Sequence, residues 1–134
     1  MRERCIKVAL ENTPSNVRCV RIRKDLSGLA ETSGSDAGLL CASRPITRRA
    51  LYVYLHECAH FVLHADGKRP RYVEEYEAEQ WAHKVMRVAG IPPKADRLIR
   101  ARARAFDLLI CARQCPQART GGASPYRVVS PLLD

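Results

Sequence analysis

The chain has 134 residues, and its 23 lysines and arginines against 14 aspartates and glutamates give it a net charge of +9. This length predicts one domain of ordinary size and argues against a second full domain. A hydrophobic fraction of 46% excludes disorder along the whole chain. Because a chain of this length can bury roughly two-thirds of its unfolded surface, we expect a hydrophobic core that depends on neither disulfides nor a structural metal.

Several features predict a soluble, cytoplasmic protein. Residues 1–7 are charged and no apolar run follows them, which argues against a secretory signal. The longest strongly apolar stretch, residues 50–55, is far too short to cross a bilayer, so we expect no contact with a membrane. The six cysteines are then expected to stay reduced. Cys111 and Cys115 form a close pair, but no second Cys or His pair lies nearby, and we assign them no metal site.

The first part of the chain has the character of β-strands. Residues 5–10 and 17–23 are separated by a turn-prone sequence at 12–16, and the second segment alternates apolar with basic residues. These two segments predict a β-hairpin with one solvated face. Residues 26–36 are rich in serine, glycine and threonine and predict a loop, after which residues 37–42 predict a third strand at the edge of the sheet.

From residue 47 the pattern changes to helical spacing, which predicts a helix over 47–64. A second helix is expected over 72–89 and a third over 95–112. Residues 116–134 show no clear period and predict an irregular C-terminal tail that follows a domain of residues 1–115. The expected fold is α+β, with a small N-terminal sheet packed on the first of these helices and two further helices after it.

The first predicted helix carries the sequence His56-Glu57-Cys58-Ala59-His60, an H-E-x-x-H motif. Residues four apart lie on one face of a helix, so both imidazoles can reach a single cation at roughly 2.0 to 2.1 Å. Glu57 is rotated by about 100° from His56 and can stand over a water on the metal instead of binding the metal. In a chain of this composition the motif arises by chance in fewer than roughly one case in a hundred. The spacing therefore predicts two metal ligands and a general base.

A catalytic zinc usually takes three protein ligands and keeps a fourth position for water, so one more ligand is needed. His64 continues the series, but eight residues of helix span about 12 Å, too far for His56 and His64 to share an ion near His60. Four glutamates in the first turns of the second predicted helix are the next candidates. The first two lie near the edges of the apolar face, and the other two point more sideways. In chain order they are Glu74, Glu75, Glu77 and Glu79.

Two blocks of the sequence resemble the ImmA/IrrE family of small bacterial zinc metallopeptidases. They read H-E-C-A-H-F-V-L-H at 56–64 and E-Y-E-A-E-Q-W-A at 75–82. Members of that family show H-E-L-G-H-x-x-L-H and later E-x-x-A-x-x-F-A, so the order and spacing agree. The chain departs from the family pattern at 58–59, with Cys-Ala for Leu-Gly, and at 81, with Trp for Phe. The resemblance covers about residues 51–86, roughly a quarter of the chain.

The resemblance implies a zincin-like endopeptidase that holds one Zn²⁺ per chain. His56, His60 and Glu75 would be the metal ligands and Glu57 the general base. The family's fold implies a sheet beside the active-site helix with the substrate along an edge strand, for which residues 37–42 are the candidate. The implied substrate is an intracellular regulatory protein such as a transcriptional repressor, for example of a mobile element or a stress response.

The residue that would stabilise the oxyanion is not distinguished by the sequence. A donor is needed at that position, and four side chains in the motif region carry a suitable group. These candidates are Tyr72, Tyr76, His64 and His83.

Charge is uneven along the chain, which leaves other functions open. Residues 51–83 carry three basic and six acidic residues, whereas residues 84–134 carry ten basic and three acidic ones. The arginines of the third predicted helix could contact nucleic acid, steer an acidic partner or form a solvated face. The alternative function is therefore a basic binding module, for nucleic acid or as an anti-repressor, with a structural or vestigial metal site. A third possibility is a latent protease with the tail over the cleft. The arginines concerned are Arg97, Arg100, Arg102, Arg104 and Arg113.

Overall fold

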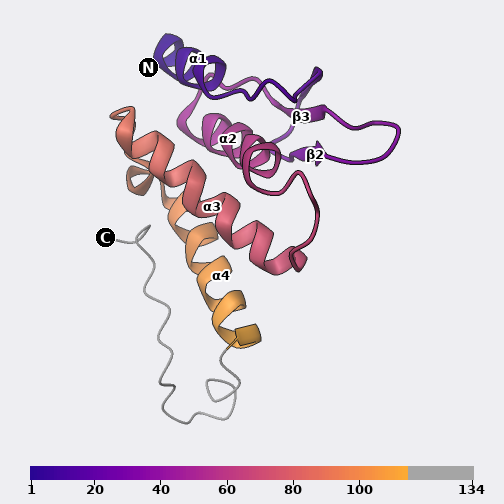
Figure 1. Cartoon of the computed structure of the whole chain (residues 1–134). Helices are drawn as coiled ribbons and strands as arrows, with labels where there is room; N and C mark the ends of the chain where they lie inside the picture. Colours follow the sequence, from indigo (N-terminus) through magenta and orange to yellow (C-terminus); the bar gives the residue numbers. More distant parts are fainter. Residues whose placement is uncertain (115–134) are drawn as a thin grey trace.

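The computed structural model describes residues 1–114, which form an α+β fold of four α-helices and a small sheet (Figure 1). This class is the one predicted. The predicted boundary at residue 115 and the tail at 116–134 lie outside the described residues. None of the helices described combines the length and the apolar composition that a membrane span requires. The elements in chain order are α1 (Arg2–Glu11), β1 (Cys19–Arg23), β2 (Leu29–Glu31), β3 (Leu39–Ser43), α2 (Arg48–Leu63), α3 (Arg71–Val88), η1 (Pro93–Ala95) and α4 (Arg97–Gln114).

The strand predicted over residues 5–10 is wrong, because this segment belongs to helix α1. Cys5, Val8 and Ala9 are its buried residues, and they are spaced by three and one, which places them on one side of a helix. A short apolar run fits both periods, so its pattern alone could not separate helix from strand. The helix is also tied to a distant part of the chain, since Arg4 donates to the carbonyl of Ala89 (3.0 Å). The predicted hairpin therefore does not form.

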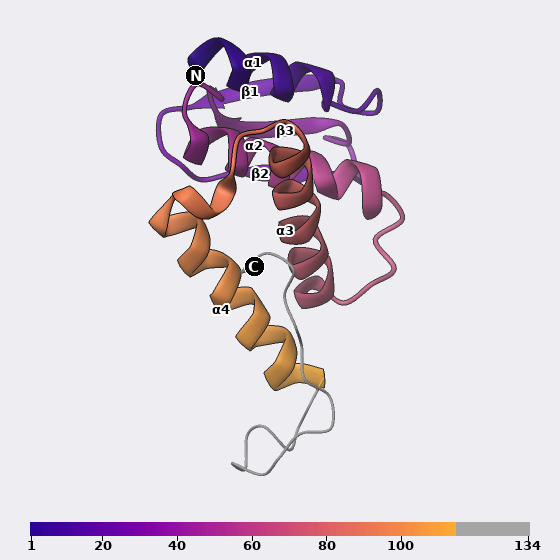
Figure 2. The ribbon, with the colours of Figure 1, turned by 90° about the vertical axis from the view of Figure 1, so that its left-hand side faces the viewer.

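The sheet has the order β1-β3-β2 and corrects two further predictions (Figure 2). β3 pairs in parallel with β1 and antiparallel with β2, so the predicted edge strand at 37–42 is the central strand. Leu40 and Ala42 are fully buried and Cys41 nearly so, as expected for a strand with neighbours on both sides. The predicted loop at 26–36 contains β2, a strand of three residues that is too short to show a period.

Helix α2 forms the centre of the molecule and packs against β3, α1 and α3. Its predicted span is confirmed to within one residue at each end. Thr47 caps the first turn, because its hydroxyl accepts from the amide of Ala50 (3.1 Å). Leu51, Leu55 and Cys58 are fully buried, and apolar residues surround most of the helix. The helix that carries the H-E-x-x-H motif is therefore held on several sides.

Helices α3 and α4 also match the predicted spans, with α4 shifted by two residues. The shift comes from Asp96, whose carboxylate accepts from the amides of Leu98 (2.9 Å) and Ile99 (3.2 Å) and so fixes where α4 begins. The same carboxylate pairs with Arg49 at the start of α2 (2.7 Å). In Figure 2, α3 runs from the end of the molecule opposite α1 up to the sheet, and α4 extends away from the sheet toward that opposite end.

Candidate metal centre

Two rows of side chains, one on α2 and one on α3, meet in the interior. Within each row the residues are four apart, so they share one face of their helix. The rows run in opposite directions, with His60 beside Glu75 at one end and the ring of Tyr52 beside that of His83 (5.3 Å) at the other. The row on α2 consists of Tyr52, His56, His60 and His64. The row on α3 consists of Glu75, Glu79 and His83.

The structure brings His56, His60 and Glu75 into one group that could hold a metal ion. One atom from each lies within 4.8 Å of the others. The Nε2 atom of His56 lies 2.8 Å from one oxygen of Glu75, and the Nε2 atom of His60 lies 3.4 Å from the other. Two imidazole nitrogens and a carboxylate oxygen are a donor set that zinc takes in catalytic sites. The residues present therefore fit the predicted ion in number and in chemistry.

The protonation states of His56 and Glu75 suit metal binding, and His60 would bind an ion only in its neutral form. Burial lowers the pKa of His56 to about 4, so its ring is neutral at pH 7 and offers a lone pair. Burial alone would lower the pKa of His60, but its hydrogen bond to Glu75 and the surrounding carboxylates outweigh that effect and raise it. For Glu75, burial is outweighed by hydrogen bonds and charge from both imidazoles, which hold its pKa well below the usual range. The carboxylate is therefore ionised.

Glu57 lies beside this group but outside it. Its side chain is 7% exposed and packs against Gly28 in the turn before β2. A Cβ atom at Gly28 would stand 2.6 Å from Oε1 of Glu57, closer than real contacts allow. Burial raises the pKa of Glu57 to about 7, although the neighbouring His60 opposes the shift. A carboxylate with that pKa exchanges protons readily near neutral pH, as a general base must.

A cavity of about 590 Å³ opens next to these residues. One wall is formed by residues 26–32, which comprise β2 and the turns that flank it. The opposite wall comes from α2, α3, α4 and the turn after α2, and it includes Glu57 and two of the three candidate ligands. The side chains on that wall are Glu57, His60, His64, Arg71, Glu74, Glu75, Arg102 and Phe106.

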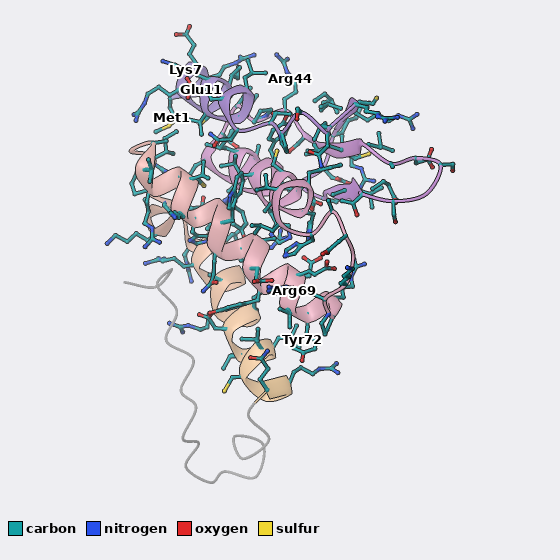
Figure 3. All side chains as sticks on the ribbon, viewed as in Figure 1. Met1, Lys7, Glu11, Arg44, Arg69 and Tyr72 are labelled. Atoms are coloured by element: carbon teal, nitrogen blue, oxygen red, sulfur yellow. The ribbon has the colours of Figure 1, made fainter. Side chains whose placement is uncertain are left out.

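The remaining candidate ligands lie outside the metal group. His64 is buried at the end of α2, where its Nδ1 atom lies 3.2 Å from Nδ1 of His60. Its Nε2 atom lies 3.3 Å from Glu77, which also pairs with Arg69 in the turn before α3. In Figure 3, Arg69 is labelled near the N-terminal end of α3. Glu77 therefore contacts His64 instead of the group, and the prediction that His64 would not join the ligands agrees with this arrangement.

The prediction that Glu79 points sideways is wrong, since its side chain is fully buried. Its Oε1 atom lies 3.6 Å from Nδ1 of His56 and 2.8 Å from Nε of Arg102 on α4. Burial raises the pKa of Glu79 to about 8, against the opposing charge of Arg102. Glu79 follows Glu75 by four residues, and this spacing could have indicated that both side chains lie on the same face of α3. No pattern in the sequence pointed to Arg102.

The four candidate oxyanion donors lie in different surroundings, and of the four only His64 lines the cavity. His83 is fully buried beside Tyr52, and the hydroxyl of Tyr76 accepts from Gln80 (2.8 Å). The guanidinium carbon of Arg113 lies over the ring of Tyr72, 5.8 Å from the centre of that ring.

In comparisons with known proteins, no family model, no curated protein and no solved structure matches the chain.

Proposed function

We propose that the protein is a zinc-dependent endopeptidase with a zincin-like fold, related to the ImmA/IrrE metallopeptidases by its two motif blocks. The observation that carries the proposal is the position of Glu57 on the wall of the cavity that also exposes His60 and Glu75. A structural metal site needs no extra carboxylate beside its ligands. A catalytic site does need one, and here that carboxylate has a pKa of about 7.

The chemistry follows from this arrangement. Zinc held by His56, His60 and Glu75 would supply a Lewis acid that polarises a peptide carbonyl and makes water more acidic. Glu57 takes the proton from the attacking water and passes it to the leaving amine, so one residue serves as base and then as acid. The walls of the cavity exclude part of the bulk solvent and hold the scissile bond near Glu57.

The substrate is proposed to bind along β2 instead of residues 37–42, which form a central strand. β2 pairs with β3 on one side, and no other strand among residues 1–114 pairs with its second edge. An extended peptide can add to such an edge through main-chain hydrogen bonds. Because β2 also forms a wall of the cavity, a peptide bound there would pass directly over Glu57. A regulatory protein, such as a repressor, is the substrate class that the resemblance favours.

The test compares the full-length wild type with Glu57→Gln, both loaded with zinc. Each is incubated with the proteins encoded by neighbouring genes and with a pool of unfolded polypeptides, and new termini are identified by mass spectrometry. We expect termini that form with the wild type, disappear with a chelator and are lost in Glu57→Gln, because the amide cannot take a proton. Glu11→Gln, a change on the distant helix α1, serves as the control and should cleave like the wild type.

Two outcomes would contradict the proposal. Identical termini from the wild type and Glu57→Gln would show that Glu57 is no base. Tight binding of one neighbouring protein or of nucleic acid, with no cleavage by either variant, would favour the basic binding module.

A further inference from the structure

We propose that Glu79, held by Arg102, is a positioning residue for the metal ligand His56, so that helix α4 forms part of the metal centre. This inference rests on the proposed metal site. It concerns the boundary between α2, α3 and α4, and it assigns a role to a pair that the proposed reaction does not use, the fully buried Glu79 and the partly exposed Arg102 that also lines the cavity.

The argument begins at the imidazole of His56. Its Nε2 atom faces Glu75, so its Nδ1 atom points away from the ligand group. This Nδ1 atom is buried and has no hydrogen-bond partner among residues 1–114, and Oε1 of Glu79 lies 3.6 Å from it. An imidazole that binds a metal through one nitrogen carries its proton on the other, and that N–H commonly donates to a carboxylate. Glu79 is placed to accept it with a small movement.

Glu79 itself is a costly residue at this position. It is fully buried, on a face of α3 where Ala78 and Ala82 are fully buried too. Taking a carboxylate out of water costs several kcal/mol by general estimates, and a buried ion pair often stabilises a protein no better than apolar residues of the same size. Packing therefore gives no reason for a glutamate here, whereas orientation of a ligand does.

Arg102 compensates this burial and fixes the carboxylate. Its Nε atom lies 2.8 Å from Oε1 of Glu79. Its guanidinium also lies over the rings of Tyr52 (5.3 Å) and Phe106 (5.7 Å). These contacts come from three different helices, so the guanidinium has little freedom. The ring of Phe106 in turn lies 6.1 Å from that of His56, which adds a second contact between α4 and the same ligand.

The experiment measures zinc affinity by competition with a chelator, together with the melting temperature of the metal-free protein, on full-length variants. Glu79→Gln keeps the size of the side chain but replaces its carboxyl group by an amide, so no carboxylate can accept from Nδ1 of His56. We expect its zinc affinity to fall about 10- to 100-fold, as for other partners of metal-binding histidines. Glu11→Gln is the control, because it makes the same replacement on the distant helix α1, away from the ligands and the cavity. Its affinity should stay within about threefold of the wild type.

Variants of Arg102 test the second half of the inference. Arg102→Met should lower the zinc affinity and Arg102→Lys should restore part of it, whereas Arg100→Met, on the exposed side of α4, should not change it. The absorption spectrum of the cobalt-loaded protein gives a readout that a purely structural role would not move, and it should change in Glu79→Gln.

The outcomes are distinguishable. Zinc affinity in Glu79→Gln equal to that of the wild type, with an unchanged cobalt spectrum, would overturn the inference even if the variant melts at a lower temperature. An equal loss of affinity in Glu11→Gln would also overturn it, because the effect would then not depend on contact with His56. If the wild type binds no zinc, the proposed function fails instead.

Discussion

The side chain of Glu57 packs directly against the backbone of Gly28, and the position of the proposed general base depends on the absence of a side chain there. The carboxylate is nearly buried, and its outer atoms lie where a side chain at position 28 would begin. Gly28 is not required here for an unusual backbone angle, since the positive-φ glycines lie elsewhere. It is required for close approach, which a sequence shows only as one more glycine in a loop.

Gly28→Ala therefore tests whether the position of Glu57 matters. The added methyl group would force the carboxylate away from its place, and we expect kcat of the cleavage reaction to fall on the order of 10²-fold, the contribution of a positioned base. Zinc content should stay at the wild-type level, because the three atoms nearest to the new methyl group all belong to Glu57, which is not a candidate ligand. Ser35→Ala is the control, since that residue is exposed, lies in the loop between β2 and β3 and does not line the cavity, so kcat should stay at the wild-type level. Wild-type kcat in Gly28→Ala would show that the carboxylate has no fixed place.

The candidate site could be predicted from the sequence only as far as local spacing reaches. His56, Glu57 and His60 lie on one helical turn, so their relative positions follow from helix geometry alone. The choice of Glu75 over Glu74 needed the resemblance, because both lie near the edge of one helix face. The contact between Glu79 and Arg102 joins two helices, and a single sequence shows no pattern that fixes such a contact.

Helix α4 depends on its first turn, where Asp96 serves two purposes. Its carboxylate accepts from two amides of the turn and also pairs with Arg49 on α2. Burial alone would raise the pKa of Asp96, but the bonds from Arg49 and the amides outweigh it and lower the pKa. A lowered pKa means that the charged form stabilises the fold above the unfolded-state pKa, and that this contribution is lost as pH falls through the folded-state pKa.

Asp96→Asn separates the charge from the cap, since asparagine caps helices about as well as aspartate. We expect the metal-free variant to lose about 0.5 kcal/mol of stability at pH 7, the usual size for a partly exposed pair. The difference in melting temperature from the wild type should disappear as the pH is lowered below the folded-state pKa of Asp96. Glu11→Gln, which removes an exposed pair with Lys7, should melt like the wild type throughout. A loss for Asp96→Asn that is the same at every pH would assign the effect to the cap instead of the charge.

The long helices were predicted correctly and the short elements α1 and β2 were not, and the difference has a physical reason. α2, α3 and α4 are each longer than fifteen residues, so apolar positions recur often enough to define a period. α1 and β2 are short, and a short apolar run is compatible with either period. The order of the strands depends on pairing between distant segments, with β1 beside β3 through a crossover, and local alternation carries no information on that choice.

Across the whole molecule, the candidate centre lies where three parts of the chain meet. α2 supplies two ligands and Glu57, α3 supplies the third ligand, and α4 reaches the same region through Arg102. The sheet contributes the edge of β2, which forms part of one wall of the cavity. Arg102, one of the arginines predicted to face a partner, is partly exposed and lines the cavity, while its guanidinium also packs over the ring of Tyr52. Arg97, Arg100 and Arg104 remain exposed on α4.

The zinc content of the purified, full-length protein tests the metal centre most directly, measured by elemental analysis after removal of loosely bound metal. We predict about one zinc per chain in the wild type and in Glu57→Gln, and loss of the metal in His60→Ala and in Glu75→Ala, because each change removes a ligand. Zinc retained in Glu75→Ala but lost in Glu74→Ala or Glu77→Ala would contradict the ligand assignment. A wild-type protein that binds no zinc would contradict the metal centre itself.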